Sequence, residues 1–245
     1  MLGMTTTTDS VTTGVREIAE ALGGGIKEGS LIMVEGEAKT GKSVICQYIT
    51  YGVLHSQDTS VAYFTKKYTA EGLVAQMESI SLDVRKEVMT DRLRVYPLYE
   101  GNVITNSKQL LQQLINNIVA IPRRFKLVIV DSVTPLITRV DIVAKVDFVQ
   151  VCKEMCRNDR SVVLVIDRHI YEGRSLSRVY GMSDYYLELK THDSILEPGQ
   201  VDTRVIKMLN VTKLAGAERH SQGDVKFEIK PGVGIQILPF VKVRI

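Results

Sequence analysis

The chain has 245 residues, of which 44% are hydrophobic and 24% charged, as is usual for a globular protein and unusual for a disordered one. Its net charge of +3 is too small to indicate nucleic-acid binding by itself, and no apolar run approaches the ~18 residues of a transmembrane helix. We therefore expect a cytoplasmic protein with no direct membrane insertion.

Residues 1–13 are rich in threonine and lack an apolar period, so we expect a flexible N-terminal tail. Residues 14–245 are enough for a single α/β domain. Within that domain, apolar residues recur at helical or strand spacing. In chain order, the spacing predicts a helix over 15–22, a strand over 31–34, a helix over 44–54, a strand over 60–65, a helix from about 69, a strand over 93–96, a helix over 110–119, a strand over 126–132, a helix over 142–157 and a strand over 162–166.

The alternation of strands and helices predicts a mostly parallel central sheet flanked by helices on both faces. From Tyr185 onward the pattern changes, because strand-like segments follow one another without helices between them. We expect these segments to add antiparallel strands at one edge of the sheet. They cover residues 186–189, 201–211, 225–229 and 235–243.

Residues 36–43 fit the phosphate-binding pattern G-x-x-x-x-G-K-[ST] without a mismatch. They lie between a predicted strand and a predicted helix, which is the context that this motif requires. A glycine-rich turn that only caps a helix would not explain the lysine and serine after the second glycine. The motif therefore predicts a nucleotide-binding site. Its candidate residues are Gly36, Glu37, Ala38, Lys39, Thr40, Gly41, Lys42, Ser43 and Val44.

Each part of this motif has a chemical role. Gly36 and Gly41 let backbone N–H groups turn inward around phosphate oxygens at a helix N-terminus. Lys42 is expected to reach the β and γ phosphates, and the hydroxyl of Ser43 to bind Mg²⁺, which prefers hard oxygen ligands. Lys39 is unusual, because many such loops carry another glycine at this position.

The apolar strand predicted over residues 126–132 ends in Asp131. The carboxyl end of a parallel strand lies on the ligand side of an α/β sheet. Beside a phosphate loop, such an aspartate typically holds Mg²⁺ through a water molecule, so we expect this role for Asp131. The alternative is an aspartate that caps the following turn.

Residues 168–180 contain three arginines and two tyrosines, and we interpret them as a loop. Arginine pairs with phosphate and tyrosine can stack on bases, so this loop could contact nucleic acid. It could instead contact a neighbouring subunit or the nucleotide, or simply be a solvated loop.

Taken together, these landmarks resemble the RecA superfamily and, within it, single-domain KaiC-like proteins. The resemblance rests on residues 23–29, 36–43, 130–134, 211–216 and 227–235. It implies a RecA-like P-loop fold, binding of ATP with Mg²⁺, and a homo-oligomeric ring with nucleotide near the subunit interfaces.

Among KaiC-like proteins, the chain is similar to accessory proteins of the archaeal flagellum (archaellum) motor. This resemblance implies two partners, namely the archaellum motor ATPase and a ring or membrane-associated scaffold protein. It also implies a location at the cytoplasmic face of the membrane, reached through those partners.

Two departures from the KaiC-like pattern bear on hydrolysis. The strand over residues 60–65 is followed by Lys66 and Lys67, where KaiC-like ATPases have glutamates that activate the attacking water. A protonated lysine has no lone pair with which to accept a proton. The second departure is Ala215, which replaces the arginine of a Lys-x-Arg-Gly motif whose basic residues reach the nucleotide of the adjacent subunit, although Lys213 is retained.

Glu71 and Asp167 are the carboxylates that could replace the missing base. Glu71 falls in the first turn of a predicted helix, where an acidic residue is ordinarily explained by the helix dipole. Asp167 follows another strand and could simply orient the next loop. We therefore assign no catalytic residue.

The sequence thus predicts an ATP-binding regulatory or assembly subunit that hydrolyses ATP slowly or not at all, because Gly36, Lys42, Ser43 and Asp131 are present while the catalytic groups are missing. Two alternatives remain. One is a RecA-type protein that binds single-stranded DNA, and the other is an active ATPase that uses Glu71 as its base.

Overall fold

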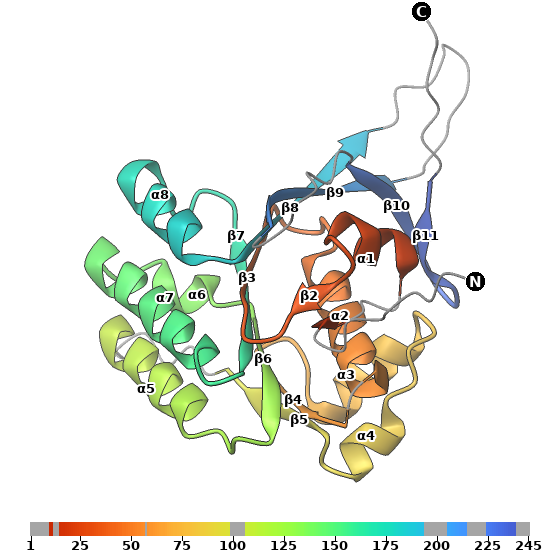
Figure 1. Ribbon diagram of the computed structural model, residues 1–245, viewed down its shortest axis with the longest axis horizontal. Helices are drawn as coiled ribbons and strands as arrows, with labels where there is room; N and C mark the ends of the chain where they lie inside the picture. The colour runs from red at the N-terminus through yellow and green to blue at the C-terminus, as the bar shows by residue number, and fades with distance from the viewer. Residues whose placement is uncertain are drawn as a thin grey trace, which may run out of the picture.

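A computed structural model describes residues 10–11, 15–56, 58–98, 106–193, 205–214 and 224–238. Within these ranges the chain forms an α/β fold, in which helices cover both faces of one large sheet (Figure 1). The helices are α1 (Arg16–Ala21), α2 (Lys42–Ser56), α3 (Ala70–Glu78), α4 (Arg85–Met89), α5 (Ser107–Val119), α6 (Thr134–Ile137), α7 (Ile142–Cys156) and α8 (Gly173–Met182). The strands are β1 (Ser10–Val11), β2 (Ile26–Lys27), β3 (Leu31–Gly36), β4 (Ser60–Thr65), β5 (Leu93–Pro97), β6 (Phe125–Asp131), β7 (Ser161–Asp167), β8 (Tyr185–Asp193), β9 (Val205–Leu214), β10 (Val225–Lys230) and β11 (Gly234–Ile237).

The large sheet has the strand order β11-β10-β9-β8-β3-β7-β6-β4-β5. Neighbouring strands from β8 to β5 are parallel, whereas β9, β10 and β11 are antiparallel additions beside β8. The predicted α/β class, with a mostly parallel sheet and antiparallel C-terminal strands, is confirmed. Strands β3, β4, β6 and β7 are almost entirely buried, as uninterrupted apolar runs covered on both faces predict.

Strand β8 and helix α8 correct two predictions. The segment at 186–189 was expected to be antiparallel, but β8 is parallel to β3. The reason is that residues 168–180, expected to be a loop, contain most of α8, which provides the crossover that two parallel strands need. A reciprocal capping interaction between Glu172 and Ser175 begins α8, and Val179 is the residue that α8 buries.

Two hydrophobic clusters hold the layers together, one on each face of the sheet. Helices α1 to α4 lie on one face and α5 to α8 on the other (Figure 1). The first cluster joins the sheet to α2 and α3 and extends to the C-terminal strands through Leu209 and Phe227. The second joins the opposite face to α5 and α7, where Leu114 and Phe148 are buried. The C-terminal strands are therefore part of the same packed domain as the phosphate loop.

Some predicted segments lie partly outside the described residues, namely most of the tail over 1–13, residues 201–204 and residues 239–243. Within the tail that was expected to be flexible, Ser10–Val11 form β1, which pairs antiparallel with β2. Side-chain periodicity cannot reveal a strand of two residues. Across the ranges given above, none of the helices has the length and apolar character needed to cross a bilayer.

Candidate functional site

The phosphate loop and three neighbouring strand ends meet at one edge of the sheet. Gly36 of β3 lies beside Asp167 of β7 in the strand register, and Thr65 of β4 lies beside Asp131 of β6. Parallel strands end at the same edge, so the loops that follow these strands converge. Residues from distant parts of the sequence therefore face one another across this edge.

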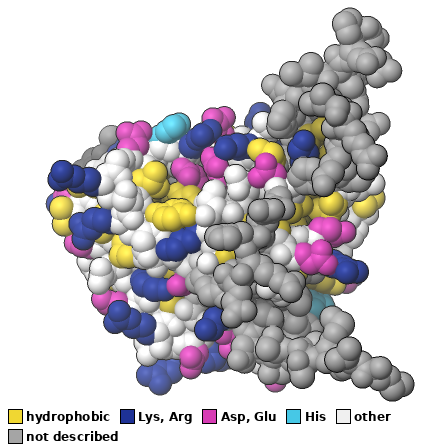
Figure 2. All heavy atoms as spheres, turned by 45° about the horizontal axis from the view of Figure 1, so that its top comes forward, with side chains coloured by type: hydrophobic (Ala, Val, Ile, Leu, Met, Phe, Trp, Pro, Cys, Tyr) yellow, Lys and Arg dark blue, Asp and Glu magenta, His cyan; other side chains and the backbone are white. Residues whose placement is uncertain are grey.

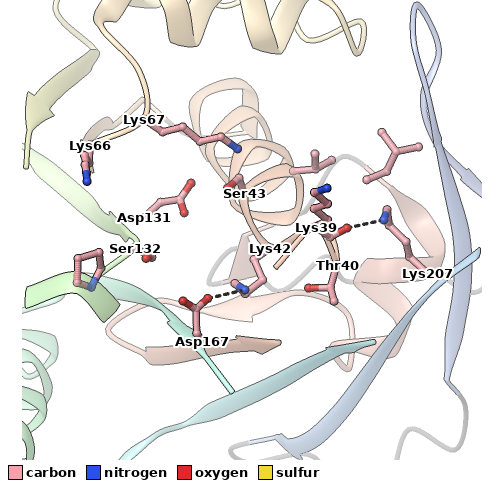
Figure 3. Close-up of a pocket in the computed structure, with 14 residues that line it drawn as sticks. Lys39, Thr40, Lys42, Ser43, Lys66, Lys67, Asp131, Ser132, Asp167 and Lys207 are labelled. Atoms are coloured by element: carbon pink, nitrogen blue, oxygen red, sulfur yellow. Dashed lines mark hydrogen bonds and ion pairs between the residues drawn. The ribbon is translucent and has the colours of Figure 1, made fainter. Parts of the chain in front are cut away.

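A cavity of about 500 Å³ opens at this edge (Figure 3). It brings together five residues of the predicted loop motif, the adjacent Val44, Asp131, Asp167, and the two lysines expected at the positions of catalytic glutamates. The residues that line it are Lys39, Thr40, Gly41, Lys42, Ser43, Val44, Lys66, Lys67, Asp131, Ser132, Pro135, Asp167, Lys207 and Ile229. Gly36, Glu37 and Ala38 shape the loop without lining the cavity.

The loop backbone turns through conformations that favour glycine. Gly41 has a φ of 102°, directly before α2 begins at Lys42. Lys39 has a φ of 66°, in the left-handed region where glycine is common. This conformation explains why many such loops carry glycine at the position of Lys39. Lys42 and Ser43, the first residues of α2, line the cavity, and a helix N-terminus is suited to binding anions.

The side chain of Lys42 is held at three points. Its Nζ donates to the carbonyl oxygens of Gly36 and Glu37, at 2.6 and 2.8 Å, and to Oδ1 of Asp167 at 2.9 Å. These contacts place the ammonium group beneath the loop, where a phosphate oxygen could replace the exposed carboxylate of Asp167 as an acceptor. The Lys42 side chain is nearly buried, whereas 48% of the Asp167 side chain is exposed.

Asp131 is also positioned by a specific contact. The hydroxyl of Tyr63 donates to Oδ2 of Asp131 at 2.9 Å. Burial raises the pKa of Tyr63, so this hydroxyl remains a donor at neutral pH. One carboxylate oxygen of Asp131 is thereby occupied, and the other is left to accept from a ligand or a bound water.

These groups fit a nucleoside triphosphate with Mg²⁺. The loop supplies N–H donors and Lys42 supplies a cation for phosphate, while Ser43 and Asp131 supply hard oxygen ligands for the metal. Across the described ranges, no three His, Cys, Asp or Glu side chains are grouped so as to hold a metal ion. Mg²⁺ in this site would therefore take its remaining ligands from phosphate and water, as it commonly does.

Two functional contacts could not be inferred from the sequence. Lys207 of β9 donates from Nζ to the backbone oxygen of Lys39 at 2.6 Å, and burial lowers the pKa of Lys207. Tyr63 is an ordinary apolar strand residue in sequence, yet it holds Asp131. Lys207 reaches the loop only because β9 folds back along β8, and no local motif marks that pairing.

Two candidate residues lie away from the cavity. Glu71 is exposed in the first turn of α3, and hydrogen bonds to its own backbone and to Thr69 lower its pKa. Lys213 donates from Nζ to the carbonyl oxygens of Tyr180 and Gly181, at 2.5 and 3.1 Å, and burial lowers its pKa. Neither side chain lines the phosphate cavity of its own chain. Ala215 lies outside the described residues.

Helix α8 changes what the segment over 168–180 can do. Tyr171 is buried, and the hydroxyl of Tyr180 donates to the carbonyl oxygen of Thr212 at 2.5 Å. Arg174 and Arg178 are exposed and lie one turn apart on α8. The tyrosines therefore pack within the domain, whereas these two arginines face solvent.

A family model described as "ATPase: KaiC" matches residues 11–242. The chain belongs to the KaiC family of ATPases. Membership of this family implies nucleotide binding, which agrees with the phosphate loop at the sheet edge.

Curated relatives of this KaiC-family chain include two archaeal flagellar ATP-binding proteins named FlaH. FlaH of Sulfolobus acidocaldarius is 24% identical over 232 residues, which cover 94% of the chain and 96% of that protein. FlaH of Methanocaldococcus jannaschii is 39% identical over 83 residues, which cover only 34% of the chain and 35% of that protein.

The crystal structure of the Methanocaldococcus jannaschii flagellar accessory protein FlaH has the same fold. Its TM-score is 0.75 at 22% identity, and the match covers 95% of this chain and 99% of that structure. The family model and the curated FlaH relatives confirm the sequence-based resemblance to KaiC-like proteins and to archaeal flagellar accessory proteins.

Proposed function

We propose that this KaiC-family protein is an ATP-binding regulatory subunit that holds Mg-ATP and hydrolyses it very slowly or not at all. The observation that carries this proposal is the cavity itself. Lys42, Ser43 and Asp131 line it together with Lys66 and Lys67, which stand where catalytic glutamates would be. The groups that hold a nucleotide are present, whereas the expected base is absent from these two positions.

The two carboxylates that line the cavity already have other partners. Asp131 accepts from Tyr63, and Asp167 accepts from Lys42. A carboxylate that must activate water needs a free oxygen near the attacked phosphorus and a pKa high enough to take a proton. Glu71 has a lowered pKa and does not line the cavity, which disfavours the active-ATPase alternative.

Each nucleotide-binding group has a defined role in the proposed complex. The loop N–H groups and Lys42 would bind phosphate, Ser43 would bind Mg²⁺, and Asp131 would bind a water in the metal's coordination shell. When bound, Mg²⁺ would neutralise phosphate charge. Lys213 would contribute only from a neighbouring subunit, since it does not line the cavity of its own chain.

The proposed setting is the archaellum motor. FlaH is described as an archaeal flagellar ATP-binding protein, and the similarity to it spans nearly the whole chain. We therefore propose a cytoplasmic homo-oligomeric ring that docks on the motor ATPase and on a ring or membrane-associated scaffold. Bound ATP would favour the assembled form, because nucleotide that binds only one of two states shifts the equilibrium toward it.

Light scattering with purified protein in Mg-ATP, in Mg-ADP and without nucleotide tests this role. We expect Mg-ATP to increase the mean mass or the fraction bound to the motor ATPase, and we expect Lys42→Ala to remove that response. The matched control is Lys86→Ala, which changes an exposed lysine of α4 outside the cavity. A mass and a partner affinity that ignore nucleotide would contradict the regulatory role.

Single-stranded DNA binding is less well supported. The tyrosines of residues 168–180 pack within the domain, so they do not offer faces for base stacking. Basic and acidic side chains are interspersed on the face drawn in Figure 2, whereas nucleic-acid binders typically show a continuous basic stripe. Two exposed arginines, Arg174 and Arg178, offer few contacts for the phosphates of a DNA strand.

A further inference from the structure

The phosphate cavity carries more positive charge than its motif requires. Five lysines and two aspartates line it, which leaves a net charge of +3 on its walls. Only Lys42 belongs to the invariant part of the phosphate-binding pattern. The other lysines are Lys39 and Lys207 on the loop side and Lys66 and Lys67 on the opposite wall. Such a concentration of one sign in a cleft raises the local potential for a polyanion.

Lys42 and Lys207 have identifiable places. Lys42 is engaged by the loop carbonyls and Asp167, and Lys207 donates to the backbone of Lys39. Lys207 thus ties β9 to the loop. These contacts account for two of the three cations on the side where the α and β phosphates are expected.

Lys66 and Lys67 occupy the wall where a terminal phosphate would end. The Lys67 backbone N–H donates to the Thr65 hydroxyl at 3.0 Å, which fixes the turn after β4. Its Nζ lies 5.2 Å from the centre of the Tyr68 ring, which is a cation-π contact. In Figure 3 the Lys67 ammonium group points across the cavity toward Ser43. This turn therefore presents a cation at the far end of the phosphate site.

We propose that Lys67, assisted by Lys66, binds the terminal phosphate of a nucleoside triphosphate, so that the site selects triphosphate over diphosphate with little dependence on Mg²⁺. This inference rests on the proposed nucleotide site. A strand-end lysine supplies a donor and a positive charge where Mg²⁺ would otherwise supply charge alone. A diphosphate lacks the group that reaches this wall. Lysines at the positions of the expected glutamates would thus remove a base and add a group that senses the γ-phosphate.

Isothermal titration calorimetry with ATP and ADP, each in excess Mg²⁺ and in EDTA, tests the inference. For the natural protein we expect ATP to bind at least tenfold more tightly than ADP, and EDTA to weaken ATP binding less than tenfold. Lys67→Gln should weaken ATP binding at least tenfold and ADP binding less than threefold, and it should make ATP binding more sensitive to EDTA. The double variant Lys66→Gln/Lys67→Gln should remove the preference for ATP.

Lys86→Gln is the matched control, because it removes an exposed lysine that does not line the cavity. Equal losses of ATP and ADP affinity in Lys67→Gln, or no loss, would overturn the inference. Lys42→Ala separates the two proposals. If it leaves ATP affinity unchanged, the nucleotide site is wrong and the inference fails with it. If it abolishes binding while Lys67→Gln leaves the ATP-to-ADP ratio intact, only the role of Lys67 is wrong.

Discussion

Lys42→Ala is expected to lower ATP affinity at least 100-fold while leaving the domain folded. Lys42 is the lysine of the phosphate-binding motif, and its Nζ already lies under the loop between Gly36, Glu37 and Asp167. A hydrogen bond to a charged group contributes about 1.5–3 kcal/mol, and about 2.7 kcal/mol corresponds to 100-fold in affinity. The variant gives up such bonds to phosphate, whereas the ion pair with half-exposed Asp167 adds little to stability.

Thermal unfolding with and without ATP reports this loss directly. Ligand at 100 times its dissociation constant stabilises the folded state by about 2.7 kcal/mol, which for a domain of this size raises Tm by roughly 5–10 °C. We expect the natural protein and Lys86→Ala to show this shift and Lys42→Ala to show almost none. A full shift in Lys42→Ala would mean that the phosphate site is elsewhere.

Gly36→Ala is expected to destabilise the domain by about 3 kcal/mol and to remove nucleotide binding. A Cβ at this position would lie 2.5 Å from the carbonyl oxygen of Leu189 and 2.7 Å from Oγ1 of Thr40. The Leu189 oxygen belongs to β8, the strand paired with β3, so it cannot move without disturbing the sheet. The loop would have to shift instead, and its N–H groups would no longer converge on phosphate.

Chemical denaturation of Gly36→Ala and Gly181→Ala separates this steric effect from a general effect of losing glycine. Gly181 lies in α8, and a Cβ added there would meet no atom within 4 Å beyond its chain neighbours and its own helix backbone. Alanine at this position should therefore be neutral or stabilise by about 0.5–1 kcal/mol. We expect a lower midpoint only for Gly36→Ala. Equal midpoints for the two variants would show that the strand can accommodate the added methyl group.

Short sequence patterns correctly predicted the phosphate loop with its flanking elements and the strand that carries Asp131. The strand, loop and helix around Gly36–Ser43 and the buried strand before Asp131 follow from short motifs and apolar runs. The parallel pairing of β8 was missed because α8 was not predicted. Its sequence is short and rich in arginine and glycine, which is a composition typical of a loop. Because α8 was missed, β8 was grouped with the antiparallel C-terminal strands instead of with the parallel strands.

The contacts that adjust the site were not predictable, because they cross the sheet. Tyr63 meets Asp131 only through the register of β4 with β6, and Lys207 meets the loop only after β9 pairs with β8. Pairing between distant strands is set by packing of the whole sheet, which no local residue pattern records. The position of Lys66 and Lys67 beside the phosphate site, by contrast, was predicted from the resemblance to KaiC-like proteins, and both residues line the cavity.

Steady-state ATP hydrolysis by the purified protein, with Lys42→Ala measured alongside, tests the central claim most directly. Enzymes commonly turn over about 10 times per second, and loss of a general base costs roughly 10²- to 10⁴-fold. With Lys66 and Lys67 in the cavity, we predict bound ATP and a turnover of no more than about 0.1 per second on that basis. Rapid hydrolysis that Lys42→Ala abolishes would contradict the account.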